Sequence, residues 1–176
     1  IDRRPIAKSQ LDRAVRMIKE SKKPIIICGG GVRYSGAEKQ LLAFAEKYNI
    51  PIAETQAGKG IIPWQNPLNL GGIGVTGGKA ANVIGRDADL VIGVGTRFSD
   101  FTTSSKWLFN ENRKVLAINI CPFDAYKMDA EAVVADAREA LDALVDALDG
   151  YKTKYNDEIS KAKAEWDAIV DDYYTK

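Results

Sequence analysis

The sequence contains no histidine and only two cysteines among its 176 residues. Without an imidazole there is no Ser–His or Cys–His dyad, no histidine metal ligand and no ordinary proton shuttle near pH 7. Cys28 and Cys121 cannot complete a four-ligand zinc site by themselves, and two cysteines do not form a secreted disulfide framework. We therefore expect no catalytic residue of these types, no metal site and a reducing, cytoplasmic compartment.

Strong net charge and long apolar runs are also missing. Twenty-five Lys and Arg against 24 Asp and Glu leave a net charge of +1, which gives no footprint for nucleic acid or an anionic membrane. No apolar run approaches the roughly 18 residues of a membrane-spanning helix, and no signal-peptide pattern is visible. We expect neither nucleic acid nor membrane as a partner. Because the chain starts at Ile1, with methionines only at Met17 and Met128, we expect either a piece of a longer protein or a chain whose start was removed.

What the sequence does have is 45% hydrophobic residues, arranged in short apolar segments that alternate with amphipathic ones. Pro24–Cys28 is wholly apolar, rich in β-branched residues and followed by glycines, as is typical of a strand buried on both faces. Further strands are expected near Leu70 and over Pro51–Thr55, Asp89–Val94, Lys114–Ile120 and Ala132–Ala135. This alternation predicts a three-layer α/β/α fold, with a parallel sheet of five or six strands between helices.

Capping patterns predict where helices begin. A Ser or Asp followed three residues later by an acidic residue occurs at Ser9/Asp12, Ser35/Glu38 and Asp136/Glu139. A further helix of about nine residues is expected from Lys79. Gly150 ends the alternation, and a charged final helix with one apolar face follows. We therefore divide the chain into a domain over residues 1–150 and a C-terminal helix or linker over residues 151–176, leading toward a next domain.

Eleven of the fifteen glycines lie between positions 29 and 78. At the carboxyl ends of parallel strands, glycine lets backbone amides approach a phosphate, but tight turns require glycine whatever they bind. The G-x-G-x-x-G spacing fails after Cys28, because its third glycine falls on Tyr34. Gly72–Gly77 matches it, but no acid follows at the next strand end, so we interpret this match as accidental for NAD. Arg97 either pairs with a phosphate or forms a salt bridge.

Other polar, thiol and aromatic residues have a structural interpretation beside a functional one. Asp100 and Asp124 are expected either to contact a ribose or to cap helices, and we favour the caps. Residues 102–105 are typical of a helix start. Both cysteines are expected to be small buried hydrophobes rather than reactive thiols. Three tryptophans are expected to pack against the core or a neighbouring domain, the last of them on the terminal helix: Trp64, Trp107 and Trp166.

Four glycine-bearing segments in this order carry a resemblance to a known family: Lys23–Gly31, Thr55–Pro63, Gly71–Gly78 with Ala81 and Asn82, and Asp89–Asp100. Over about residues 8–150 the chain resembles the central domain of thiamine-diphosphate enzymes of the acetohydroxyacid synthase and pyruvate oxidase type. The resemblance implies a six-stranded parallel, Rossmann-like sheet of the DHS-like NAD/FAD-binding type. It also implies a pyrimidine-binding domain before this one, a diphosphate-binding domain after it, and a homo-oligomeric parent, dimer or tetramer.

Residues 22–136 resemble, more narrowly, the branch of that family that acts in myo-inositol catabolism. That branch adds the thiamine ylid to a ring ketone, cleaves the adjacent C–C bond and hydrolyses the product to an open-chain deoxy acid. The resemblance places the activating Glu in the first domain, and the Gly-Asp-Gly motif that holds Mg²⁺ and the diphosphate in the third. This chain has no Gly-Asp-Gly, so the resemblance implies a structural, inter-domain role and no activity for the chain alone.

Flavin-binding relatives hold FAD in the crevice of this domain. The matching positions are Gly30, Gly31, Thr55, Gly74, Gly95, Thr96, Arg97 and Asp136. Phe101 stands where those relatives have Arg, and Asn119 and Cys121 stand where they have acids. We favour an unoccupied crevice. The alternatives are a flavin- or nucleotide-binding central domain of an acetohydroxyacid synthase-like enzyme, a stand-alone nucleotide-binding module, and, least favoured, a small hydrolase, for which no nucleophile has a plausible base.

Overall fold

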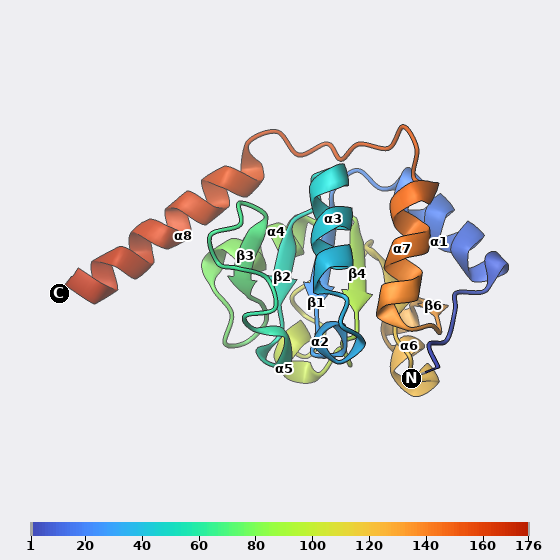
Figure 1. Ribbon diagram of the computed structural model, residues 1–176. Helices are drawn as coiled ribbons and strands as arrows, with labels where there is room; N and C mark the ends of the chain where they lie inside the picture. The colour runs from blue at the N-terminus through green and yellow to red at the C-terminus, as the bar shows by residue number, and fades with distance from the viewer. Residues whose placement is uncertain (1, 176) are drawn as a thin grey trace.

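One parallel sheet organises the protein, whose computed structural model describes residues 2–175. The sheet has six strands in the order β3-β2-β1-β4-β5-β6, and every neighbouring pair is parallel (Figure 1). The strands are β1 (Pro24–Cys28), β2 (Ile52–Glu54), β3 (Asn69–Gly72), β4 (Leu90–Val94), β5 (Lys114–Ile118) and β6 (Glu131–Val133). The predicted six-stranded, Rossmann-like sheet is thus confirmed.

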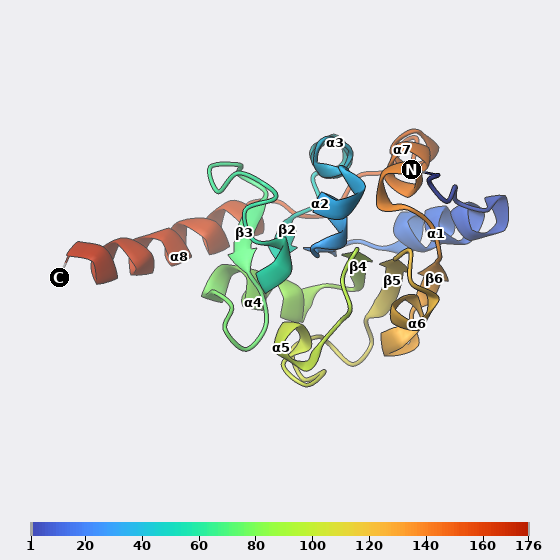
Figure 2. The ribbon, with the colours of Figure 1, turned by 60° about the horizontal axis from the view of Figure 1, so that its bottom comes forward.

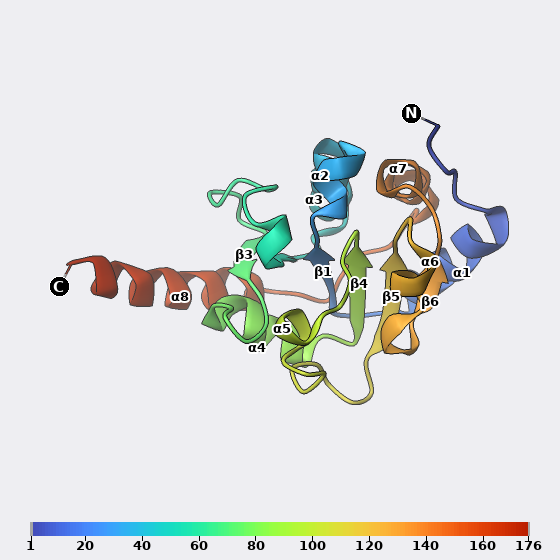
Figure 3. The ribbon, with the colours of Figure 1, turned by 90° about the horizontal axis from the view of Figure 1, so that it is seen from below.

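Helices cover both faces of this sheet and complete the three layers (Figure 3). One face carries α2 (Gly31–Ser35), α3 (Glu38–Tyr48) and α7 (Ala137–Ala147), and the other carries α4 (Lys79–Asp87) and α5 (Asp100–Thr103). The helix α1 (Lys8–Glu20) contacts β6 and α7, and α6 (Pro122–Ala125) contacts β6. Short 3₁₀ turns occupy Gln56–Gly58 and Lys127–Asp129.

The central strands are apolar because both of their faces are covered. All five residues of β1 and all five of β4 are buried, as the wholly apolar Pro24–Cys28 segment predicted. One large cluster of buried side chains runs from Ala14 in α1 to Ile159 in α8 (Glu158–Thr175), and a second, small cluster consists of Ala125, Ala132 and Val134. Burying an isoleucine such as Ile26 fully stabilises the fold by about 1.5–3 kcal/mol relative to leaving it exposed.

The strand order reverses direction at β1, which lies between β2 and β4. The connection after β1 moves outward to β2, while β4 returns to the other side of β1. In such sheets the loops at the carboxyl ends of the strands diverge at this point and leave a crevice between them. Figure 3 looks onto these carboxyl ends.

Two of the three predicted capping boxes are wrong. The helix α1 begins at Lys8 with Ala7 as its N-cap, so Ser9 lies inside the first turn. Ser35 is the last residue of α2, and α3 begins three residues later. The Ser35 hydroxyl instead donates to Asp136 Oδ1 at 2.7 Å and accepts from the backbone N–H of Arg138 at 3.1 Å. The Ser35 hydroxyl therefore makes a tertiary contact in place of the helix cap that the local spacing predicted.

The third predicted cap is confirmed. The carboxylate of Asp136 accepts hydrogen bonds from the backbone N–H groups of Arg138 and Glu139 at the start of α7. It also accepts two hydrogen bonds from Arg3 Nη1 at 3.0 Å. Burial alone would raise the pKa of Asp136, but the hydrogen bonds from Ser35, Arg3 and the helix lower it below its usual value.

The C-terminal segment is helical over a shorter range than predicted. Residues 151–157 run along the body, and α8 begins at Glu158. The helix contacts α4 and β3, and Lys79 of α4 pairs with Glu165 at 2.9 Å. Lys163 Nζ lies 3.5 Å from the centre of the Trp64 ring, in the loop before β3. Its C-terminal part projects away from the body (Figures 1 and 2). Across residues 2–175, no helix has the length and apolar character needed to span a bilayer.

Candidate ligand crevice at the carboxyl edge

A cavity of about 490 Å³ lies where the loops after β1, β2, β4 and β5 diverge. Six of the eight residues expected to bind a cofactor line it: Gly30, Gly31, Thr55, Gly95, Thr96 and Arg97. They are separated by up to 67 positions in the sequence (97 − 30) and meet because the carboxyl ends of parallel strands share one edge of the sheet. The volume of the cavity falls within the range of about 300–1,000 Å³ that is typical of small-molecule sites.

The other two expected residues, Gly74 and Asp136, lie outside the lining of this cavity. Gly74 has φ +98°, and a Cβ there would overlap the carbonyl oxygen of Phe101. Its N–H donates to Asn82 Oδ1 at 2.9 Å. Asp136 is engaged with α7 and Arg3. Both residues therefore have structural partners that the resemblance did not identify.

The glycines after β1 serve close packing between loops. The N–H of Gly29 donates to the carbonyl of Val94 at 2.9 Å, and the N–H of Gly31 donates to that of Gly95 at 3.0 Å. A Cβ at Gly31 would lie 2.7 Å from Gly95 Cα, and a Cβ at Gly58 would overlap the carbonyl of Cys28. A phosphate-binding glycine loop offers free N–H groups to its ligand. Two of these N–H groups are already donated within the fold.

The G-x-G-x-x-G spacing at residues 72–77 also has a packing origin. A Cβ at Gly77 would lie 2.6 Å from the carbonyl oxygen of Gly72, and the N–H of Gly78 donates to that same oxygen at 2.8 Å. The turn therefore closes on itself before α4 begins at Lys79. This geometry favours the interpretation of the match as accidental for NAD.

Polar side chains of the crevice mostly bond within the protein. Asn119 Nδ2 donates to the Thr96 carbonyl at 2.9 Å, while Asn119 Oδ1 accepts from the N–H of Cys121 at 3.0 Å. Asp124 pairs with Lys127 at 2.6 Å. Arg97, by contrast, is exposed and makes no ion pair with any residue from 2 to 175. A ligand in this crevice would therefore find one uncompensated guanidinium.

The hydroxyls of the crevice lack the partner that a nucleophile needs. Ser99 Oγ and Thr102 Oγ1 lie 3.3 Å apart and bond each other, and Thr55 Oγ1 accepts from the N–H of Gly58 at 3.1 Å. Within residues 2–175, no group of three or more Cys, Asp or Glu side chains is placed to hold a metal ion. The hydroxyls of the crevice are thus held by hydrogen bonds within the fold.

Glu54 is a residue that the sequence reasoning missed. It is the last residue of β2, is only 5% exposed, and its Oε1 accepts from the N–H of Gly60 at 3.2 Å. Burial raises the pKa of Glu54, and hydrogen bonds from the backbone of Ile62 and Gly60 and from Asn69 counteract the rise. The signal for it was a carboxylate directly after the apolar residues 51–53, within a segment predicted to be a strand. Glu54 holds the loop that forms one wall of the crevice.

The two cysteines differ, although both were expected to be buried. Burial raises the pKa of Cys28 to about 12. For Cys121 the prediction is wrong, because its side chain is exposed. The strand β5 ends at Ile118, not at Ile120 as predicted, so Cys121 lies beyond the sheet and immediately before α6.

The strand order, the reversal at β1 and the crevice beside it define a doubly wound α/β domain of the nucleotide-binding type. The chain belongs to a narrower family within that class, the thiamine pyrophosphate enzyme central domains, whose family model matches residues 11–144. The resemblance noted from the glycine-bearing segments is thereby confirmed.

Three similar curated proteins carry the name 3D-(3,5/4)-trihydroxycyclohexane-1,2-dione hydrolase. The chain is 57% identical to the protein from Clostridium tetani over 170 residues, which are 95% of this chain and 26% of that protein. It is 55% identical to the protein from Geobacillus thermodenitrificans over 94% of this chain and 26% of that protein. It is 56% identical to the protein from Bacillus cereus over 95% of this chain and 26% of that protein. The chain thus spans about a quarter of the length of these relatives.

Proposed function

We propose that this chain is the central domain of a thiamine-diphosphate-dependent hydrolase that opens the ring of trihydroxycyclohexane-1,2-dione in myo-inositol catabolism. The observation that carries the proposal is the 57% identity, over 95% of the chain, to a relative of that name. In the longer enzyme, which we place in the cytoplasm, the domain orients its neighbours and contributes to a homo-oligomer, a dimer or tetramer.

The residues of this chain do not fit thiamine diphosphate or Mg²⁺. The sequence has no Gly-Asp-Gly motif, and residues 2–175 bring together no cluster of metal-ligating side chains. We therefore assign both groups to the flanking pyrimidine- and diphosphate-binding domains, where thiamine diphosphate would supply the electron sink for C–C cleavage. The chain by itself is expected to be inactive.

For the crevice we favour a packing role without a bound cofactor, because the N–H groups of Gly29 and Gly31 are donated to neighbouring loops. The alternative is a nucleotide or FAD, as in an acetohydroxyacid synthase-like enzyme. That alternative is supported by a cavity of about 490 Å³ and by the unpaired Arg97. The residues proposed to contact such a ligand are those of the expected set that line the cavity: Gly30, Gly31, Thr55, Gly95, Thr96 and Arg97.

A comparison of the full-length enzyme with the 176-residue chain tests the function. The full-length enzyme should hydrolyse the cyclic diketone only when thiamine diphosphate and Mg²⁺ are added, and the chain alone should not hydrolyse it. Hydrolysis that does not depend on thiamine diphosphate would overturn the proposal.

Thermal unfolding of the chain with ADP, NAD or FAD decides between the two views of the crevice. A true ligand at 100 times its Kd would stabilise the protein by about 2.7 kcal/mol. We expect no shift with any of the three. A shift that disappears in Arg97→Gln would establish the nucleotide alternative.

A further inference from the structure

Exposed apolar side chains gather at the carboxyl edge of the sheet. Six of the eleven exposed large hydrophobic side chains among residues 2–175 form what we name the carboxyl-edge rim: Tyr34, Val75, Phe101, Ile120, Phe123 and Tyr126. Each is more than half exposed, and Tyr34 reaches 91%. Single exposed apolar residues are ordinary, but a gathering of this kind marks an interaction surface.

The rim is continuous with the crevice. Tyr34 and Phe101 line the cavity, and the N–H of Val75 donates to the Phe101 carbonyl at 2.9 Å. On the other side, Lys127 Nζ lies 4.8 Å from the centre of the Phe123 ring and donates to the Arg97 carbonyl at 3.3 Å. Rim and crevice thus form one surface, with apolar side chains around a polar centre. Such a surface excludes water when a partner covers it.

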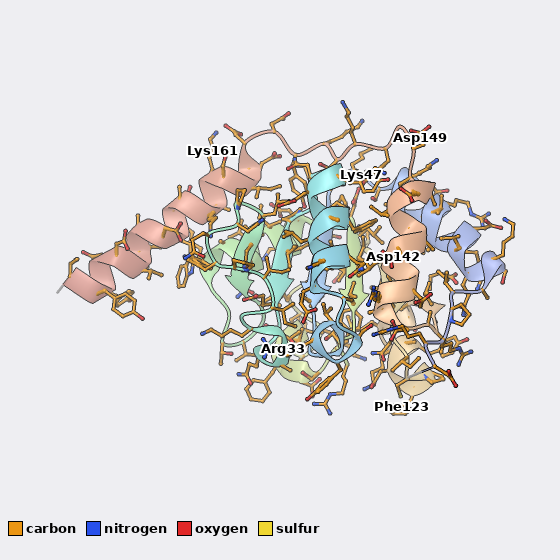
Figure 4. The ribbon with its side chains drawn as sticks, in the orientation of Figure 1. Arg33, Lys47, Phe123, Asp142, Asp149 and Lys161 are labelled. Atoms are coloured by element: carbon orange, nitrogen blue, oxygen red, sulfur yellow. The ribbon has the colours of Figure 1, made fainter. Side chains whose placement is uncertain are left out.

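Two arginines at this surface, Arg33 and Arg97, indicate the charge that its partner should carry. Arg33 lies within the short helix α2, and both it and Phe123 are labelled in the lower part of Figure 4. Neither Arg33 nor Arg97 has a carboxylate partner among residues 2–175. The complementary surface is therefore apolar, with carboxylates placed opposite these two arginines.

The N-terminal segment is fixed beside the same surface. Arg3 Nη1 donates to Ser35 Oγ at 3.2 Å and to Asp136, and the Arg4 carbonyl accepts from the N–H of Asp136 at 2.9 Å. Ser35 is the neighbour of Tyr34 in the rim. In Figures 1 and 3 the N-terminal end lies at the carboxyl edge on the α7 side, while α8 projects sideways beyond β3, at the other end of the sheet.

We propose that the carboxyl-edge rim is covered by the domain that precedes this one in the same polypeptide. The inference rests on the proposed function, in which this chain is the central domain of a longer enzyme. A domain tethered at Arg3 is held at high effective concentration beside the rim. The domain that follows is joined through α8, which projects sideways beyond β3 at the end of the sheet opposite Arg3, and it is therefore the less suitable occupant.

Cys121 supplies a native probe of this surface, because its exposed thiol lies between Ile120 and Phe123. Mass spectrometry measures how fast iodoacetamide labels the peptide that contains Cys121, both in the 176-residue chain and in the full-length enzyme. The buried Cys28 is the unreactive control. We expect labelling of Cys121 to be slower by at least about tenfold in the full-length enzyme, since access controls thiol modification. In that enzyme, Phe123→Ser should restore fast labelling, while Tyr174→Ser, on the exposed end of α8, should not.

The occupant is identified by placing photoreactive benzoylphenylalanine at position 123 of the full-length enzyme. We expect an intramolecular cross-link to the preceding domain, at monomer mass on a denaturing gel. A cross-link to a second copy, a cross-link to the following domain, or equal labelling of Cys121 in both proteins would overturn the proposal. An enzyme that hydrolyses the diketone with thiamine diphosphate while Cys121 remains freely labelled would refute this inference alone. Hydrolysis independent of the cofactor would remove the proposed function as well.

Discussion

At the scale of single residues, several glycines in this chain are required by the backbone that lies against them. Gly58 follows β2 and contacts the loop after β1, so that a Cβ would overlap the carbonyl oxygen of Cys28. Gly72, at the end of β3, has open space around it, with Gly77 Cα 3.8 Å from a Cβ built there. Gly58 is therefore needed for loop packing, whereas Gly72 is not.

We predict that Gly58→Ala lowers the free energy of unfolding by about 1–3 kcal/mol, the usual cost of forcing atoms into a packed site. The matched variant Gly72→Ala should change it by less than about 0.5 kcal/mol. Urea denaturation followed by circular dichroism measures both. Equal losses in the two variants would show that loop packing at Gly58 has no special role.

A second residue-scale prediction concerns Glu54 and pH. Because burial raises the pKa of Glu54 above its usual value near 4.5, the folded protein binds this proton more tightly than the unfolded chain does. The resulting stabilisation is complete below pH 4.5 and is lost as pH rises through the raised pKa. Each unit of upward shift corresponds to about 1.4 kcal/mol.

Glu54→Gln mimics the protonated side chain and removes this dependence. The variant should gain stability relative to the wild type between pH 4.5 and pH 7, as measured by urea denaturation at several pH values. Glu111→Gln, at an exposed position, is the control, and its stability should run parallel to that of the wild type. A Glu54→Gln curve that also runs parallel would contradict the prediction.

At the scale of elements, the N-terminal part of α8 is attached to the body through Ile159, Lys163 and Trp166. The Trp166 ring packs against Gly78, where a Cβ would lie 2.7 Å from Trp166 Cε2, and Tyr173 near the end of the helix is 80% exposed. A fully buried tryptophan replaced by alanine costs about 3–5 kcal/mol. Since Trp166 is only partly buried, its replacement should cost less than that.

We predict that Trp166→Ala lowers the free energy of unfolding by about 1–2 kcal/mol and detaches α8, so that its amides exchange hydrogen at least about tenfold faster. Hydrogen exchange read by mass spectrometry should locate the change in α8 and leave β1 and β4 protected. Tyr173→Ala should alter neither quantity. Uniformly faster exchange throughout the domain would instead mean that α8 is an integral part of the core.

The elements that were predictable from the sequence are those with a periodic or wholly apolar pattern. The strand at Pro24–Cys28 has the predicted bounds, and the helix from Lys79 has the predicted start. Helix starts were less predictable, because Ser35 bonds to Asp136 across 101 positions and local spacing carries no sign of that contact. The crevice followed from strand order, which places the ends of distant strands together. The partners of Gly74 and Glu54 depend on loop packing, which no pattern of residue types reveals.

At the scale of the whole molecule, one core joins almost every element. The buried cluster extends from Ala14 to Ile159 and includes residues of all three layers. Small domains in which one core dominates usually unfold in one cooperative transition.

We predict that urea unfolding curves from circular dichroism and from tryptophan fluorescence superimpose. The three tryptophans make this a demanding test, because Trp64, Trp107 and Trp166 lie in the loop between β2 and β3, in the loop before β5 and in α8. An earlier fluorescence transition would show that the edge near β3 and α8 unfolds separately.

The placement of the two chain ends has a consequence for how such a domain can be rearranged. Most domains bring their termini close together, and so they tolerate circular permutation and insertion into a loop of another protein. Here the N-terminal segment is held at the carboxyl edge by Arg3, and α8 ends on the opposite side of the molecule. A loop of a host protein would have to be spread across the width of the domain to accept it. This architecture agrees with the proposed role as a module joined in series between two others, and it resists transplantation into a single turn.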